Sequence, residues 1–199
     1  MKTILKKLSI FAAIVACIMV AQAQPTKPTQ SQAGNLDFAS KATASNNFEL
    51  QAATIALAKS QDANIKQYAQ MIADDHTAAG NELSTLVKNK NWQLSTMDDQ
   101  KYKTMIDQLN NADPANFDRI YVEIMAKTHQ EAISLFKDAS TGTTVTDADL
   151  KKFAIDKIPA FEKHLNQIKN VKPAEGHANN MPTSPGIPVK NKFPKPTLK

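Results

Sequence analysis

Apolar side chains recur every three or four residues over four long stretches of the chain, a spacing that predicts four long helices. The helices are expected over residues 35–60, from Asp62 to residue 90, from Pro114 to a break at residues 140–144, and from Thr146 or Asp147 to residue 171. Asp62 is suited to cap the second helix, and Pro114 is tolerated in the first turn of the third. Their apolar faces include Phe38, Ala52 and Ala56; Ile65, Ile72 and Leu83; Phe117, Tyr121 and Met125; and Leu150, Phe153 and Ile168.

A shorter helix is expected over residues 97–110, between the second and third long helices. Four long helices with one longer connection in the middle predict an all-α chain. We expect a ferritin-like antiparallel four-helix bundle with a short extra helix in the central connection. A simple up-down bundle with a small extra helix is the competing topology. Pro159 falls inside the last helix, where it removes one backbone hydrogen bond and predicts a kink.

Both ends of the chain differ from the helical middle. Residues 1–23 combine early lysines, an apolar stretch and an Ala21-Gln22-Ala23 cleavage pattern, as in a secretory signal peptide. Residues 24–34 form a polar linker with two prolines, and residues 173–199 form a Pro/Lys-rich tail without a periodic apolar face. The bundle domain is therefore expected over residues 35–172, with a disordered or extended tail, in an exported protein of the periplasm or envelope.

The leader also permits a second interpretation. Ile14-Val15-Ala16-Cys17 resembles the lipobox of bacterial lipoproteins, which would anchor the protein through Cys17. The apolar run continues past Cys17, whereas a lipidated cysteine is usually followed by polar residues, so the cleaved signal peptide is favoured. Cleavage after Ala23 removes the only cysteine, and with it any disulfide, thiolate metal site or cysteine nucleophile.

The net charge of +5 comes from the two ends. Without Lys2, Lys6 and Lys7 the chain keeps 21 basic and 19 acidic residues; the tail holds four lysines against Glu175, which leaves 17 basic and 18 acidic residues between. A net charge of −1 lacks the basic excess of a nucleic-acid-binding domain, so no nucleic acid partner is expected.

No apolar stretch after residue 24 is long enough for a transmembrane segment in the mature chain. The basic tail is either a solvated terminus or a weak contact for an anionic envelope surface, and the oligomeric state is left open.

Each long helix carries one metal-capable side chain on its apolar face: Glu49, His76, His129 and His164. Buried Glu and His are costly unless they are hydrogen-bonded, paired or bound to metal. Nitrogen and oxygen ligands of this kind suit zinc, iron or copper. The acidic neighbours that qualify as extra ligands or as partners orienting the imidazoles are Asp75, Glu131 and Glu162.

The same four residues also fit a buried hydrogen-bonded network that fixes the helix register and binds nothing. His164 falls later in its helix than the others, which predicts an offset of a turn or more unless the kink at Pro159 changes it. Di-iron carboxylate bundles carry Glu-x-x-His on two helices, but here Ala73, Ala126 and Phe161 stand three residues before the histidines. A di-iron oxidase or iron-storage centre is therefore not expected. The fourth histidine, His177, lies in the tail.

Four separated motifs occur in order over residues 36–171 and resemble, as a set, the bacterial exported family known as domain of unknown function 4142 (DUF4142). They are Phe48-Glu49-Leu50; Tyr68 to Thr77 with Asn81-Glu82-Leu83; Asn116 to Tyr121 with His129; and Ile158-Pro159 with His164-Leu165. The resemblance implies a ferritin-like bundle in the bacterial envelope, and it implies no established activity. The family's motif residues fall on Glu49, Asp75, His76, His129 and His164.

Three functional hypotheses follow. The first is a non-enzymatic envelope protein whose interior Glu/His cluster binds a transition metal, with a role in metal handling or stress tolerance. The second is a protein-interaction module in which the His/Glu network is purely structural. The third is a small metal-dependent oxidoreductase that uses the same residues. The sequence favours a non-enzymatic protein and identifies no catalytic residue.

Overall fold

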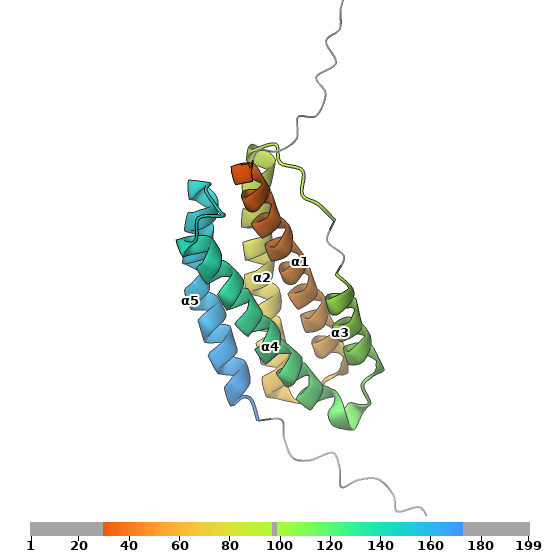
Figure 1. The fold of residues 1–199 in the computed structure, drawn as a ribbon. Coiled ribbons are helices and arrows are strands. Elements are labelled where there is room, and N and C mark those ends of the chain that lie inside the picture. The colour runs from red at the N-terminus through yellow and green to blue at the C-terminus, as the bar shows by residue number, and fades with distance from the viewer. Residues whose placement is uncertain (1–29, 97–98, 173–199) are drawn as a thin grey trace, which may run out of the picture.

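The computed structural model describes residues 30–96 and 99–172. In these ranges it contains five helices and no strand, so the predicted all-α class is confirmed. The helices, shown in Figure 1, are α1 (Gln30–Lys59), α2 (Ala63–Asn89), α3 (Gln100–Asn111), α4 (Pro114–Thr141) and α5 (Ala148–Asn170). The predicted signal peptide, Cys17, and the predicted tail with His177 lie outside the described residues.

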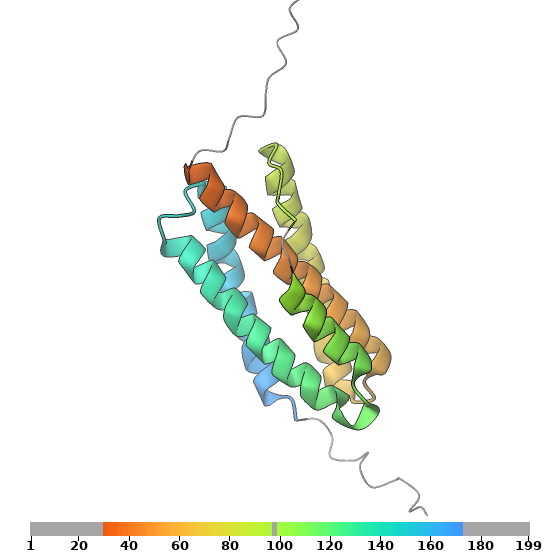
Figure 2. The same ribbon diagram turned by 45° about the vertical axis from the view of Figure 1, so that its right-hand side comes forward.

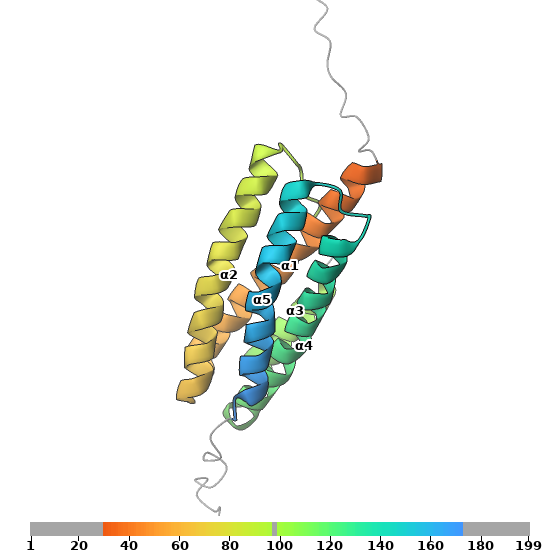
Figure 3. The same ribbon diagram turned by 90° about the vertical axis from the view of Figure 1, so that its left-hand side faces the viewer.

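Four long helices run side by side, with α1 against α2 and α4 against α5 as the two most extensive pairs. The pairs meet through contacts of α1 with α4 and of α2 with α5, and each of these neighbours runs in the opposite direction (Figures 1 and 3). The short α3 packs on α1 and α4 (Figure 2). None of the helices in the described ranges combines the length and the apolar character that a membrane span requires.

Three aspartates begin three of the helices, because their side chains accept hydrogen bonds from backbone N–H groups of the first turn. The Asp62 side chain accepts hydrogen bonds from backbone N–H groups in the first turn of α2, as predicted. Asp113 and Asp147 accept such bonds at the starts of α4 and α5. Replacing such a cap costs about 1 kcal/mol of stability. Pro114 follows Asp113 at the first helical position, where its missing N–H removes no helical bond.

The first helix begins at Gln30, earlier than the predicted boundary between linker and bundle at residue 35. A tertiary contact accounts for the difference. Gly34 lies so close to the connection between α4 and α5 that a Cβ atom there would overlap the Thr144 carbonyl oxygen. The Asn35 side-chain oxygen accepts hydrogen bonds from the backbone N–H groups of Thr146 (2.8 Å) and Asp147 (3.2 Å). These contacts hold the first turns of α1 against the other helix pair.

The interior consists of two apolar clusters that meet near the middle of the bundle. One includes Phe48, Ile65, Leu109, Phe117 and Tyr121, and the other includes Phe38, Leu83, Phe136, Leu150 and Phe153. The candidate histidines lie where the clusters meet. Tyr68 of the first cluster lies 6.5 Å from the His129 ring, and Phe161 of the second stacks on His76 at 5.4 Å between ring centroids.

Candidate metal centre

Three histidines from three helices converge in the bundle interior. His76 on α2, His129 on α4 and His164 on α5 are 3%, 1% and 0% exposed. Their ring centroids lie 5.4 to 5.8 Å apart. Each ring offers one nitrogen to a set whose members all lie within 4.8 Å of one another. The structure therefore brings together three of the four residues that the sequence placed on the apolar faces.

His164 lies at the level of the other two histidines, without the offset expected from its late position in the sequence of α5. His129 precedes the last residue of α4 by 12 positions, and His164 follows the first residue of α5 by 16. The two helices run in opposite directions from a short connection, and the centroids of the two rings lie 5.4 Å apart.

Two of the rings are anchored by oxygen atoms that act as acceptors. His129 donates from Nδ1 to the Met125 carbonyl oxygen, one helical turn earlier, at 2.9 Å. His164 donates from Nε2 to Oδ2 of Asp75 on α2 at 2.8 Å. A carbonyl or carboxylate oxygen requires the proton on the nitrogen that faces it. These bonds therefore fix both the tautomer and the orientation of each neutral imidazole.

The third ring is anchored from α1. The Nδ1 atom of His76 lies 3.2 Å from the Asn46 side-chain oxygen, to which it donates. Gly80 follows His76 by one helical turn and leaves the space that Asn46 fills: a Cβ atom at Gly80 would lie 2.7 Å from Asn46 Nδ2. Asn46 was not predicted from the sequence, although it precedes Glu49 by three residues and so shares its helical face.

The remaining nitrogen of each ring is buried and has no hydrogen-bond partner among the described residues: His76 Nε2, His129 Nε2 and His164 Nδ1. An unprotonated imidazole nitrogen is a metal ligand. Metal–nitrogen bonds of about 2.0–2.1 Å around a tetrahedral ion place the ligand atoms about 3.3 Å apart. One nitrogen of each ring lies within 4.8 Å of one nitrogen of the other two, so small side-chain rotations can bring three ring nitrogens to this spacing.

The environment keeps all three imidazoles neutral. Burial lowers the pKa of His76 well below its usual value, and the two other histidines lower it further. Burial lowers the pKa of His129 to about 4, against a smaller opposing effect of its bond to Met125. Burial also lowers the pKa of His164, although Asp75 favours its charged form. At neutral pH, protons therefore do not compete for the unpaired nitrogens.

Glu49 lies beside the three histidines and not among them. Its side chain is 1% exposed, and Oε1 lies 3.6 Å from His129 Nδ1, beyond hydrogen-bond distance and next to the nitrogen already bonded to Met125. Both carboxylate oxygens are buried without a hydrogen-bond partner in the described part of the chain. Burial raises the pKa of Glu49 to about 8. The nearby Thr128 hydroxyl offsets part of that rise, although it lies outside hydrogen-bond geometry with the carboxylate and donates to the Met125 carbonyl oxygen. The carboxyl group is therefore largely protonated at neutral pH when no cation is near.

Two tyrosines share the surroundings of Glu49. The hydroxyl groups of Tyr68 and Tyr121 are also buried without a hydrogen-bond partner in the described ranges. Burial and the nearby Glu49 raise the pKa of both phenols above their usual value. This side of the site therefore holds oxygen atoms, whereas the side where the histidines converge offers nitrogen.

The other acidic candidates differ in position. Asp75 orients His164, as a partner of a metal ligand would, although its side chain is 51% exposed. Glu131 and Glu162 lie at the surface, where each pairs with a lysine at 2.7 Å, Lys101 and Lys137 respectively. Their positions two residues from a histidine place them on another face of the helix, because residues two apart do not face each other.

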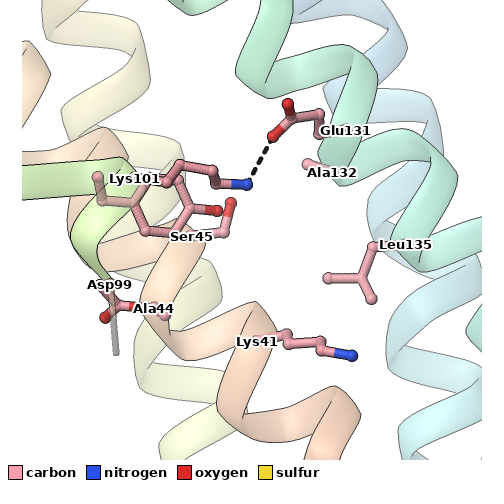
Figure 4. Close-up of a pocket in the computed structure, with 9 residues that line it drawn as sticks. Lys41, Ala44, Ser45, Asp99, Lys101, Glu131, Ala132 and Leu135 are labelled. Atoms are coloured by element: carbon pink, nitrogen blue, oxygen red, sulfur yellow. Dashed lines mark hydrogen bonds and ion pairs between the residues drawn. The ribbon is translucent and has the colours of Figure 1, made fainter. Parts of the chain in front are cut away.

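A surface pocket of about 300 Å³ lies next to the site, between α1, α3 and α4. Figure 4 shows the ion pair of Lys101 with Glu131 at its rim, and Ser45 and Ala132 in its wall. None of the three histidines lines it. This pocket therefore gives no access to the unpaired ring nitrogens.

The chain matches the model of one protein family, described as Domain of unknown function (DUF4142), over residues 20–171. No curated protein and no solved structure matches the chain. The matched range contains the five helices of the described structure, together with Glu49, Asp75 and the three clustered histidines. The chain belongs to the DUF4142 family.

Proposed function

We propose that His76, His129 and His164 together bind one transition-metal ion, and that this protein serves metal handling or stress tolerance in the bacterial envelope. The observation that carries the proposal is the hydrogen bonding of the three rings. Each ring donates its N–H to an oxygen acceptor at the edge of the cluster and keeps its second nitrogen buried and unpaired. Unpaired buried polar atoms are rare in proteins, and three in one cluster call for a shared ligand.

A purely structural network accounts less well for this arrangement. Such a network is stabilised when its members bond to one another, since a half-satisfied polar cluster costs more than an apolar core. Here the three rings bond to Asn46, Met125 and Asp75, and not to each other. The bond from His164 to a carboxylate also has the form commonly found behind metal-ligating imidazoles. A site of neutral nitrogen ligands fits zinc, copper or iron.

Glu49 fits the role of a counter-charge. An ion bound by three neutral imidazoles brings an uncompensated positive charge into an apolar interior, which is costly. The Glu49 carboxyl group lies beside His129 and loses its proton more readily when a cation is near. Burying a metal ion together with an ionised Glu49 therefore costs less free energy than burying either charge alone.

The connection between the helix pairs supports a ferritin-like bundle. Both α2 and α4 run in the same direction in Figure 1, so the chain must return along the bundle between them, and α3 lies on this return path. One long crossover between two antiparallel pairs distinguishes ferritin-like bundles from simple up-down bundles. The leader pattern of residues 1–23 supports export to the envelope.

A metal-dependent oxidoreductase is the second candidate, because three protein ligands leave a tetrahedral ion one position for another molecule. Structural zinc sites usually have four protein ligands, whereas catalytic sites commonly have three. The same geometry therefore serves storage, transfer or catalysis. Glu49, which lies beside His129 and has a pKa raised to about 8, is the candidate acid or base of such a reaction. The non-enzymatic function is still favoured here because the sequence contains no recognised catalytic motif.

Elemental analysis of untagged protein tests the proposal. We expect about one equivalent of metal in the wild-type protein and in His177→Ala, the control at the histidine outside the described residues. Replacement of His76, His129 or His164 by Ala should abolish stoichiometric binding while circular dichroism shows a folded helical protein. Wild-type protein that takes up no stoichiometric zinc, copper or iron after loading with each would contradict both the metal-binding function and the oxidoreductase alternative.

A further inference from the structure

An open groove on the surface leads to His76 from the side of α1 and α2. It has a volume of about 410 Å³, and its lining includes Asn46, Asn47, His76 and Gly80. A smaller cavity of about 20 Å³ lies deeper, where Asn46, His76 and Gly80 form part of its wall together with Phe136 and Phe161. The two cavities therefore adjoin at one neck, formed by the residues that line both: Asn46, His76, Gly80 and Leu83.

We propose that this α1–α2 groove is the entrance through which a hydrated divalent metal ion reaches the three histidines, with Asn46 as its gate. The inference rests on the proposed metal binding and adds a route to it. Of the three histidines, only His76 lines this groove and the smaller cavity behind it. An ion that enters here therefore meets the His76 ring before the other two.

Part of the groove wall has chemistry that suits the transfer of a hydrated ion. Its polar lining consists mainly of neutral amide and hydroxyl groups: Thr43, Asn46, Asn47, Thr77, Asn81 and Ser84. The rest of the wall is mainly apolar and includes Leu50, Leu83, Val87 and Leu94. Neutral oxygen atoms can replace water molecules around a cation one at a time without holding it as tightly as carboxylates would. One lysine, Lys88, also lines the groove. The path therefore favours passage over capture.

Asn46 is suited to act as a gate because its bond to His76 is the longest of the three anchors. The separation is 3.2 Å, compared with 2.9 Å for His129 and 2.8 Å for His164. Longer hydrogen bonds are weaker. Gly80 provides the space in which the Asn46 side chain sits, since a Cβ atom there would lie 2.7 Å from it. Rotation of this one side chain opens the neck without displacing a helix.

A rival route lies between α2 and α5. The groove there is larger, about 1090 Å³, and includes Tyr68, Glu162, Lys163 and Asn166. Its lining contains none of the three histidines. A bulky group placed in either groove distinguishes the two routes.

The test uses one cysteine at a time in a full-length Cys17→Ser background. Asn47→Cys places a thiol in the α1–α2 groove, and Asn166→Cys places the matched control in the α2–α5 groove; both positions are exposed. Each thiol is modified either with iodoacetamide, a small group, or with fluorescein maleimide, a bulky one. Stopped-flow measurements then give the rate of Co²⁺ uptake and the rate of its release to a chelator, and equilibrium titration gives the Kd.

A blocked entrance slows uptake and release by the same factor, because an obstacle on the path leaves the end states unchanged. We expect the bulky adduct at Asn47→Cys to slow both rates by about tenfold or more with an unchanged Kd. The small adduct, and either adduct at Asn166→Cys, should leave the rates within about twofold of the unmodified protein. Slowing from the α2–α5 position alone, unchanged rates at both positions, or a changed Kd with the Asn47→Cys adduct would overturn the entrance while leaving the metal site intact. Absence of Co²⁺ binding by the unmodified protein would overturn both.

Discussion

Two polar regions lie side by side in the bundle interior, and they differ in how their atoms are held. In the region of the three histidines, every ring has one nitrogen fixed by an oxygen acceptor. In the region of Glu49, both carboxylate oxygens and the hydroxyl groups of Tyr68 and Tyr121 lack a hydrogen-bond partner in the described ranges. The three histidines, Glu49 and the two tyrosines are all almost completely buried, so the two regions do not differ in solvent exposure.

The difference indicates two separate roles. Anchored imidazoles keep a fixed position and tautomer, as ligands of a preorganised site do. A buried carboxyl group without hydrogen-bond donors is more stable in its protonated form, and it ionises when a positive charge is nearby. The histidine region is therefore suited to hold a cation, and Glu49 is suited to respond to it.

The first prediction addresses Glu49 in metal-free protein. Burial raises the pKa of Glu49 in the folded protein from 4.5 to about 8. Between pH 4.5 and pH 8 the folded protein keeps the carboxyl proton, whereas the unfolded protein loses it. The free energy of unfolding of the wild type should therefore fall, relative to that of Glu49→Gln, as the pH rises from 4.5 to 8. Between pH 5 and pH 8 the difference in free energy of unfolding should grow by as much as about 4 kcal/mol in favour of Glu49→Gln.

Urea denaturation in the presence of a chelator measures this difference. The histidines, whose lowered pKa values destabilise the fold on acidification below pH 6.5, act equally in both proteins and cancel in the comparison. Parallel pH profiles for wild type and Glu49→Gln would show that the Glu49 carboxyl group is not held in its neutral form.

The second prediction concerns the anchor of His164. Asp75→Ala removes the acceptor of its Nε2 proton and should weaken metal affinity about 10–100-fold, because the ring loses its fixed orientation and some basicity. Asp74→Ala is the matched control, since Asp74 is the neighbouring exposed carboxylate and bonds to Gln70 on its own helix. Metal titrations monitored by competition with a chelating dye give both affinities. Equal affinities for the two variants would remove Asp75 from the site.

The smallest effect is expected at the surface carboxylates. Glu131→Gln and Glu162→Gln each remove one exposed ion pair, with Lys101 and Lys137. Exposed pairs contribute about 0–1 kcal/mol, so both proteins should unfold near the wild-type denaturant concentration. Their metal affinity should equal that of the wild type. A loss of affinity comparable with that of Asp75→Ala would show that these groups reach the site in solution.

Local patterns in the sequence were sufficient to predict most of the helices. Periodic apolar residues and the capping aspartate Asp62 depend on neighbours along the chain, and the structure has α2 where they predict it. The start of α1 was misplaced because it depends on Gly34 and Asn35 meeting the connection between α4 and α5, more than a hundred residues away. Such contacts leave no local signal.

The candidate site was predictable in its members and less so in its geometry. Burial of Glu49 and the histidines follows from their helical faces, but the level of His164 depends on how α5 packs against its neighbours. The Met125 carbonyl acceptor is a backbone atom and has no sequence signal. Asp75 bonds to His164 on another helix and not to its chain neighbour His76, which only the packing of α2 against α5 determines.

Metal binding as proposed requires that three particular nitrogens, one from each histidine ring, share one ion. A crystal structure of the metal-loaded protein, with anomalous scattering recorded at the absorption edge of the metal, tests it directly. We expect one strong anomalous peak within about 2.0–2.3 Å of His76 Nε2, His129 Nε2 and His164 Nδ1, with the bonds to Asn46, Met125 and Asp75 preserved. A peak at surface carboxylates, a peak bound through the opposite ring nitrogens, or no peak between the three rings would contradict it.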